Sequence, residues 1–229
     1  MPPGSCFSML PPLLGSWSPG VCPLLVDLAA IRGAQLSREP YEFILGSQFL
    51  KPDAVDDLRR DFPDIRKPGY LTVDEVQLQG QFKTLIEELE GSELTEELSR
   101  KFGRDLHQFP RLTTIMRQSQ PKYGAIHTDG PSKVMTMLVY MNDNWEQDQG
   151  GRLRVLYDSK FFEPYAAEVP PTMGTVFAFL RSDHSWHGHR PFAGERRVVQ
   201  VAWVKSQADL DRKRKNNRMA QLFKGIFGR

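Results

Sequence analysis

Cysteine and long hydrophobic runs are the features that this 229-residue sequence most clearly lacks. Its two cysteines, Cys6 and Cys22, both lie near the N-terminus, which excludes a disulfide scaffold and a cysteine zinc site. This low cysteine content is typical of a reducing compartment, so we expect a cytoplasmic protein. No run reaches the ~18 uninterrupted apolar residues that a membrane-spanning helix requires, which excludes an integral membrane protein.

A large charge of one sign is also lacking, because 30 Lys and Arg residues face 28 Asp and Glu residues, for a net charge of +2. The basic surplus lies in residues 211–218, which hold five Lys or Arg and one Asp. The rest of the chain is therefore slightly acidic, and we do not expect it to bind nucleic acid. With 40% hydrophobic and 25% charged residues, the composition is that of an ordinary globular protein.

The sequence divides into three segments. Residues 1–36 contain six prolines between Pro2 and Pro23 and almost no charge, which predicts a poorly ordered segment in which Met9 or a later codon is an alternative start. Residues 37–206 form the predicted domain. Residues 207–229 are predicted to form a basic amphipathic helix, because its apolar residues recur at helical spacing: Met219, Leu222, Phe223, Ile226 and Phe227.

The first half of the domain is predicted to be helical after an early strand within Tyr41–Phe49. Pro52 at a first helical position and Pro63 beyond the end predict a short helix. Thr72 and Glu75 match a capping box before a second helix with Phe82, Leu85, Ile86 and Leu89. A third helix is expected from Ser92 to Gly103.

The second half is predicted to be a set of short strands, since runs rich in Val, Thr, Leu and aromatic residues alternate with Gly, Pro, Asn and Asp. The runs are Arg111–Ser119, Lys133–Met141, Arg152–Tyr157, Gly174–Leu180 and Arg196–Val204. This pattern predicts an α+β protein with a mostly β core, built as an antiparallel sandwich or barrel. The segment Asp158–Pro171, with Phe161, Phe162 and Tyr165, is interpreted either as a lid or as a packed surface loop.

Candidate chemistry lies in the histidines. His127 and Asp129 are two residues apart and share a face if the backbone is extended, and a third imidazole from a later strand would complete a set of two histidines and a carboxylate. Such a set leaves metal positions open and suits Fe(II), although it does not by itself exclude Mn or Zn. Candidates for the third ligand are His184, His187 and His189.

Several ordered motifs together resemble the iron- and 2-oxoglutarate-dependent dioxygenases, in particular the prolyl-4-hydroxylase-like branch. They are Phe49-Leu50-Lys51-Pro52, His127-Thr128-Asp129, the strand Thr136–Asn142, Trp145, Gly150-Gly151-Arg152-Leu153, and Ser185-Trp186-His187-Gly188 followed by Arg196. The resemblance covers about residues 41–204. It implies a double-stranded β-helix, a jelly-roll or cupin-like barrel with N-terminal supporting helices and a C-terminal helix.

The resemblance also implies a site. Fe(II) would be held by His127, Asp129 and His187, and Arg196 would pair with the distal carboxylate of 2-oxoglutarate, as a guanidinium suits a carboxylate. The family spacing favours His187 over His189 and Arg196 over Arg197. Further cosubstrate-binding candidates are Tyr140, Arg117, Leu138 and Gln200. A Tyr140 that only packs in the barrel is nearly as good an interpretation. Arg117 stands where the family often has a tyrosine or another polar group, and this departure leaves its role open.

The implied activity is hydroxylation of a C–H bond, with conversion of 2-oxoglutarate and O2 to succinate and CO2. Ascorbate is an optional accessory cofactor in this interpretation. Asp129 argues against halogenation, because halogenases of the family have a small residue at this position. The alternative is a cupin-like barrel that binds metal or senses without oxygenation. The substrate, a small molecule or a protein, and the oligomeric state stay open. For residues 211–227 we expect docking on the barrel or on a second copy, with weak contact to an anionic membrane surface as the alternative.

Overall fold

The computed structural model describes residues 24–146 and 150–216. Its helices are α1 Ala29–Gly33, α2 Val55–Asp61, α3 Gly80–Leu89 and α4 Ser92–Phe102, and short 3-10 turns are η1 Pro52–Ala54, η2 Val73–Glu75 and η3 Pro121–Gly124. The strands are β1 Leu36–Ser37, β2 Phe43–Gly46, β3 Leu71–Thr72, β4 Arg111–Ser119, β5 Lys133–Tyr140, β6 Leu153–Leu156, β7 Tyr165–Val169, β8 Val176–Leu180, β9 His187–His189 and β10 Gly194–Val204. None of the helices in these residues has the length and apolar character needed to cross a bilayer.

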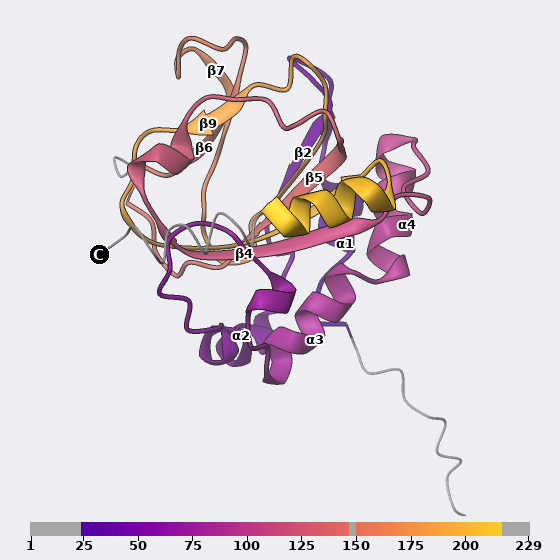
Figure 1. The fold of residues 1–229 in the computed structure, drawn as a ribbon, viewed down its shortest axis with the longest axis vertical. Helices are drawn as coiled ribbons and strands as arrows, with labels where there is room; N and C mark the ends of the chain where they lie inside the picture. The colour runs from indigo at the N-terminus through magenta and orange to yellow at the C-terminus, as the bar shows by residue number, and fades with distance from the viewer. Residues whose placement is uncertain (1–23, 147–149, 217–229) are drawn as a thin grey trace, which may run out of the picture.

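The strands form two antiparallel sheets. The larger has the order β1-β2-β8-β5-β10-β4-β3, and the smaller has the order β7-β6-β9. One apolar cluster lies between the sheets and draws Leu153, Val155 and Val169 from the smaller sheet and Leu138 and Phe177 from the larger. The two sheets therefore pack face to face as the walls of a flattened antiparallel barrel, as the strand pattern predicted (Figure 1).

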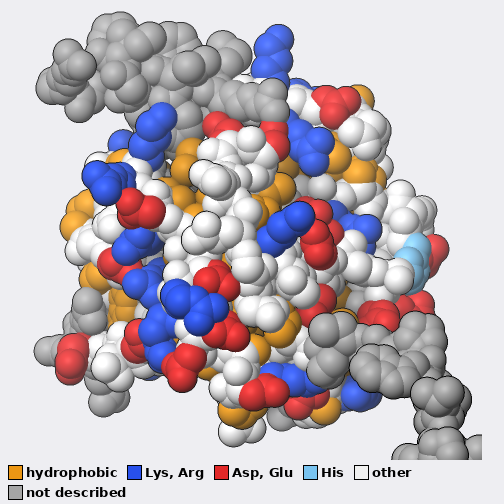
Figure 2. Space-filling model, turned by 90° about the horizontal axis from the view of Figure 1, so that it is seen from below, with side chains coloured by type: hydrophobic (Ala, Val, Ile, Leu, Met, Phe, Trp, Pro, Cys, Tyr) orange, Lys and Arg blue, Asp and Glu red, His pale blue; other side chains and the backbone are white. Residues whose placement is uncertain are grey.

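A second apolar cluster covers the other face of the larger sheet. Met135, Met137 and Val139 of β5 point into it, whereas Leu138 and Tyr140 point between the sheets, because side chains alternate along a strand. Helices α2 and α3 supply Leu58, Phe82 and Leu85 from outside. Figure 1 shows α2 and α3 on the side of the larger sheet opposite β6 and β9, and on the surface seen in Figure 2 acidic and basic side chains are interspersed.

The observed bounds of helix α4 confirm the prediction. Leu94, Leu98 and Phe102 recur at intervals of four and are buried, and the helix ends at Gly103, whose φ of 62° is the left-handed conformation that glycine adopts most readily.

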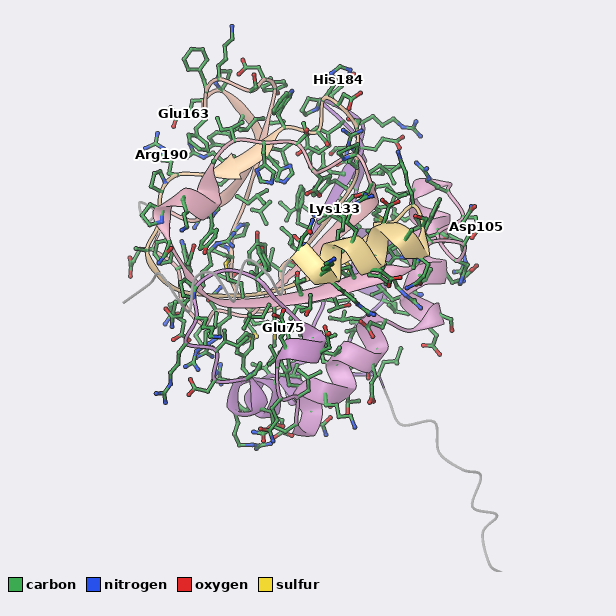
Figure 3. All side chains as sticks on the ribbon, in the orientation of Figure 1. Glu75, Asp105, Lys133, Glu163, His184 and Arg190 are labelled. Carbon is green, nitrogen blue, oxygen red and sulfur yellow. The ribbon has the colours of Figure 1, made fainter. Side chains whose placement is uncertain are left out.

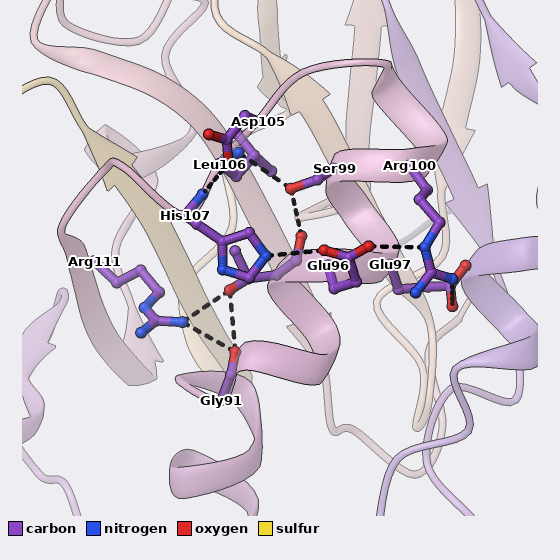
Figure 4. A network of polar contacts seen from close by, with 10 residues as sticks. Gly91, Glu96, Glu97, Ser99, Arg100, Asp105, Leu106, His107 and Arg111 are labelled. Carbon is purple, nitrogen blue, oxygen red and sulfur yellow. Dashed lines mark hydrogen bonds and ion pairs between the residues drawn. The ribbon is translucent and has the colours of Figure 1, made fainter.

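The start of β4 is tied to this helix by side-chain hydrogen bonds (Figure 4). Arg111 donates to the carbonyl oxygen of Gly91 at 3.0 Å, and the backbone N–H of Leu106 donates to Ser99 Oγ at 3.1 Å. The exposed pair His107 and Glu96 adds a contact of 3.0 Å. These contacts fix β4, a strand that contributes to the site described below.

The expectation of poor order up to residue 36 is wrong for residues 24–36, whereas residues 1–23 lie outside the described part. Val26 is buried and forms a bridge with Leu50. The carboxylate of Glu88 on α3 accepts hydrogen bonds from the backbone N–H groups of Leu25 and Val26. The prolines that suggested disorder all precede this segment, and its apolar residues find a place against the helices.

The interpretation of Asp158–Pro171 as one loop is also wrong in part, because β7 lies within it and pairs with β6. Leu153 pairs with Val169 and Arg154 with Glu168. Arg154 also donates a hydrogen bond to the carboxylate of Glu168 at 2.7 Å. Because β7 contains this charged residue, the search for apolar runs did not identify it as a strand. The segment is therefore the end of a β-hairpin, with Phe161 exposed at its tip.

Residues 207–216 are helical. Leu210 is buried against Leu112 and Val204, so this part of the predicted C-terminal helix docks on the barrel. The apolar stripe predicted for Met219–Phe227 lies outside the described residues.

Candidate active site

His127, Asp129 and His187 come together at one end of the barrel. One ligand atom from each lies within 4.8 Å of those of the other two. His127 and His187 form an isolated antiparallel bridge, in which the backbone N–H of each donates to the carbonyl oxygen of the other, at 2.9 and 3.0 Å. Asp129 follows two residues later, before β5 begins. The smaller sheet and the segment leading to β5 thus position the three side chains.

Backbone carbonyls orient both imidazoles. Nδ1 of His127 donates to the carbonyl oxygen of Ala125, and Nδ1 of His187 donates to that of Ser185, each at 2.8 Å. With the proton on Nδ1, Nε2 of each ring keeps its lone pair for a metal. Burial lowers the pKa of His187 to about 4, so this imidazole is neutral at physiological pH.

Asp129 is held as a carboxylate. Burial alone would raise its pKa, but the charge of Lys133 and hydrogen bonds from Lys133 and Thr136 outweigh burial and lower the pKa. Lys133 Nζ lies 2.7 Å from Oδ1, and Thr136 Oγ1 lies 2.5 Å from Oδ2. Each carboxylate oxygen has a second lone pair, so these bonds leave acceptor capacity for a metal. Two neutral imidazoles and an ionised carboxylate are the donor set of non-haem Fe(II) sites, and the residues present therefore fit Fe(II).

A cavity of about 120 Å³ adjoins this triad. Its lining combines the three ligands with residues of strands β4, β5, β6, β8, β9 and β10 and of the segments between strands: Tyr70, Met116, Tyr123, Thr136, Leu138, Leu153, Phe179, Gly188, His189, Arg196 and Gln200. A larger groove of about 670 Å³ lies around Phe62 and Glu75, but none of the predicted site residues lines it.

Arg196 brings a buried positive charge into this cavity. Its side chain donates from Nε to the carbonyl oxygen of Gly151 at 2.9 Å and from Nη2 to the hydroxyl of Tyr140 at 3.1 Å. Only 2% of Arg196 is exposed, and no carboxylate of the described residues forms an ion pair with it. A buried guanidinium without a counter-ion is costly, so the cavity favours an anionic ligand.

Two tyrosines surround this guanidinium. Tyr140 is fully buried, and burial raises its pKa against the opposing charge of Arg196. Burial likewise raises the pKa of Tyr70 to about 12 in spite of Arg196, so both side chains are neutral hydroxyls at physiological pH.

Of the remaining predicted cosubstrate-binding residues, two line the cavity and one points away from it. Leu138 on β5 and Gln200 on β10 are direct partners in the register and both line the cavity. Arg117 does not, and its placement near the cosubstrate is wrong: it bonds Asp64 at 2.7 Å and lies near Glu195. Its neighbour Met116 lines the cavity, so alternation turns Arg117 to the opposite face of β4.

The structure also separates the alternatives that the sequence left open. His189 lies on β9, lines the cavity and is 4% exposed, but the metal-ligand group contains His187. His184 is exposed and lies at the edge of the molecule (Figure 3). Arg197 points away from the cavity, with its guanidinium 5.4 Å from the ring centre of Phe62.

Several cavity residues were missed by the sequence analysis. Thr136 shares a strand face with Leu138 and Tyr140, so the period of two could have identified it. Tyr70 comes from an irregular segment and Tyr123 from the short turn η3, and no local pattern places them beside Arg196 or the triad.

Comparisons with known proteins agree with this site. Residues 114–205 match the family model described as the 2OG-Fe(II) oxygenase superfamily. The crystal structure of a Pseudomonas putida prolyl-4-hydroxylase is 18% identical, with a TM-score of 0.54, and the alignment covers 78% of this chain and 98% of that one. A prolyl 4-hydroxylase from Phytophthora capsici is 17% identical, with a TM-score of 0.51 and coverage of 89% and 78%. No curated protein matches the chain. These likenesses confirm the double-stranded β-helix.

Proposed function

Because residues 114–205 belong to the 2OG-Fe(II) oxygenase superfamily, we propose that this protein is an Fe(II)- and 2-oxoglutarate-dependent dioxygenase that hydroxylates a C–H bond of its substrate. Nε2 of His127, Nε2 of His187 and a carboxylate oxygen of Asp129 would hold Fe(II). When bound, the metal supplies oxygen activation coupled to conversion of 2-oxoglutarate and O2 to succinate and CO2.

The observation that carries this proposal is the buried Arg196, which lies in the same cavity as the triad and forms no ion pair with a carboxylate of the described residues. Its guanidinium would bind the distal carboxylate of 2-oxoglutarate through charge-assisted hydrogen bonds. The hydroxyl of Tyr140, already bonded to Arg196, would contribute to the same carboxylate site. Leu138 and Gln200 would line the path between this carboxylate and the metal.

Apolar side chains would exclude water from the reacting groups. Leu138, Leu153 and Phe179 line the cavity from both sheets. In a dry cavity the interactions of the guanidinium and the carboxylates are stronger than in water, and side reactions with water are suppressed.

The alternative, a cupin-like barrel that binds metal or senses without oxygenation, has no use for this arginine. Such a barrel would require only the triad.

Both functions are separated by one experiment. The purified protein is supplied with Fe(II), 2-oxoglutarate and O2, with and without ascorbate, and succinate is measured across candidate substrates. Oxygenase activity requires Fe(II)-dependent succinate formation that His187→Ala abolishes. Stoichiometric Fe(II) binding without 2-oxoglutarate binding would instead support the alternative.

The substrate is proposed only as a class, a small molecule or a protein side chain, that presents a C–H bond to the metal. A cytoplasmic location is proposed from the low cysteine content. The two neighbouring structures are named prolyl 4-hydroxylases, which makes proline-containing peptides a reasonable part of the substrate panel.

A further inference from the structure

The basic segment at the end of the described chain lies against the metal site. Its helix, residues 207–216, begins after Ser206, whose Oγ accepts the backbone N–H of Asp209 at 3.1 Å as an N-cap. Leu210 anchors the helix on Leu112 and Val204. Lys213 follows three residues later and so lies on the same side of the helix, facing the barrel.

Lys213 reaches the backbone next to a metal ligand. Its Nζ lies 3.9 Å from the position that a β-carbon would occupy on the exposed Gly130, the residue after Asp129. The side chain is partly buried, and burial and the neighbouring charge of Lys133 lower its pKa. Lys133 is labelled in Figure 3, where it lies beside this helix. Lys213 and Lys133, which are far apart in the sequence, therefore both lie near Asp129.

The carboxylates near Lys213 are already bonded to other cations. Asp129 bonds Lys133 at 2.7 Å, and Asp209 bonds Arg212. Within residues 24–146 and 150–216, Lys213 forms no ion pair. A third cation, Arg181, donates to the backbone carbonyl of Asp129 at 3.0 Å, but its charge is paired with the exposed Asp183 at 2.7 Å, so Lys213 supplies the excess charge. The surroundings of Asp129 therefore carry a surplus of positive charge, to which a bound divalent metal would add.

This surplus is separate from the proposed cosubstrate site. Thr136, which bonds Asp129, and Tyr140, which bonds Arg196, are four residues apart on β5. At a rise of about 3.3 Å per residue they are roughly 13 Å apart along the strand. The carboxylate held by Arg196 therefore cannot neutralise the lysines beside Asp129.

We propose that the substrate carries an anionic group, a phosphate or a carboxylate, which binds between Lys213 and Lys133 beside Asp129. This deepens the proposed oxygenase function and rests on it, because the anionic group would place the rest of the substrate over the metal. His127 is exposed, so the triad is open to solvent on its side, where a substrate can approach. The helix of residues 207–216 then belongs to the active site and supplies one of its binding residues.

The test is the binding of inorganic phosphate to the Fe(II) and 2-oxoglutarate complex under nitrogen, measured by calorimetry. Saturating 2-oxoglutarate occupies Arg196, so phosphate reports on the lysines. We expect Lys213→Met to weaken phosphate binding at least tenfold and Lys213→Arg to restore it. Lys215→Met is the matched control, because Lys215 lies exposed on the same helix, and it should stay within about twofold of the wild type.

Equal phosphate affinity in the wild type and Lys213→Met would overturn the proposal. So would Lys213-dependent binding to vesicles with anionic lipids in the absence of phosphate binding, which would assign the helix to a membrane surface. Glucose 6-phosphate and glucose form a matched pair that tests whether a phosphate ester is also bound through its phosphate group: glucose 6-phosphate should bind in a Lys213-dependent way, and glucose should not.

Failure of the oxygenase function is recognised separately. Binding of Fe(II) and of 2-oxoglutarate is measured on the same samples and should be equal in the wild type, Lys213→Met and Lys215→Met. If neither binds to the wild type, the oxygenase function fails, and phosphate titration of the protein without them still decides whether Lys213 binds an anion.

Discussion

Arg196 is held by Gly151: its Nε donates to the glycine carbonyl at 2.9 Å, across 45 residues of chain. Gly151 has a φ of +85°, and a β-carbon there would lie 2.8 Å from Trp145 and 3.1 Å from Phe192. Trp145 in turn donates from Nε1 to the carbonyl oxygen of Gly150 at 3.0 Å. The glycine pair and its aromatic neighbours thus aim a carbonyl at the arginine that is proposed to bind 2-oxoglutarate.

Gly151→Ala is therefore expected to weaken 2-oxoglutarate binding about tenfold, since a hydrogen bond to a charged group contributes about 1.5 kcal/mol or more. Fe(II) binding should be unchanged. Gly103→Ala is the matched control, because Gly103 also has a positive φ, of 62°, but apart from its chain neighbours no atom of the described residues lies within 4 Å of its β-carbon position. Calorimetric titration with 2-oxoglutarate measures the effect, and equal losses in both variants would contradict it.

Arg196→Ala is expected to raise the KM for 2-oxoglutarate by about 30-fold or more, since losing the partner of a buried charge costs ~2–5 kcal/mol. Arg197→Ala should leave KM nearly unchanged, because this side chain lies over Phe62 outside the cavity. Steady-state kinetics on the two variants decide between them. A large rise in the KM for 2-oxoglutarate that occurs only in Arg197→Ala would show that Arg197, not Arg196, binds the distal carboxylate.

Among the three late histidines, only His187→Ala should abolish Fe(II) binding. His189→Ala and His184→Ala should retain it, because neither residue belongs to the ligand group in the structure. His127→Ala and Asp129→Ala should behave like His187→Ala. Iron content after gel filtration measures this directly, and loss of iron in His189→Ala alone would show that the assigned ligand is wrong.

The metal-free protein should lose stability in acid because of its buried histidines. Burial lowers the pKa of His189, like that of His187, to about 4, whereas an unfolded histidine titrates near 6.5. Between these values the unfolded state holds more protons than the folded state, so stability is fully present above pH about 6.5 and is lost as the pH falls toward 4. In this pH range each histidine lowers the free energy of unfolding by up to about 1.4 kcal/mol for every pH unit of acidification.

Urea unfolding at pH 7, 6 and 5 measures this loss. His189→Gln should show a shallower decline than the wild type, since one of the two groups is removed. His184→Gln, an exposed position, should follow the wild type. A decline in His189→Gln as steep as that of the wild type would contradict the assigned cause.

The sequence predicted much of this arrangement where local chemistry decides it. The strand Arg111–Ser119 and the helix closed by Gly103 were predicted with their observed bounds, because a run of strand-forming residues and a left-handed glycine are local signals. The wrong position of Arg117 has a physical cause. Both faces of β4 are buried, from Leu112 to Met116, so its sequence does not tell which face lines the cavity.

Other parts depended on contacts between distant segments. Strand β9 has only three residues and is defined by its pairing with β6, which no periodicity in so short a run can reveal. Tyr70 reaches the cavity from a loop before β3, where only the tertiary fold determines its direction.

The backbone bridge between His127 and His187 has a consequence for how the protein meets its metal. The two residues are sixty positions apart, yet reciprocal N–H to carbonyl bonds join them directly. The entropy of closing the intervening loop is therefore lost during folding rather than during metal capture. The ligands are preorganised, so iron can be removed by a chelator and returned while the barrel stays intact, unlike a zinc finger, whose fold exists only around its ion.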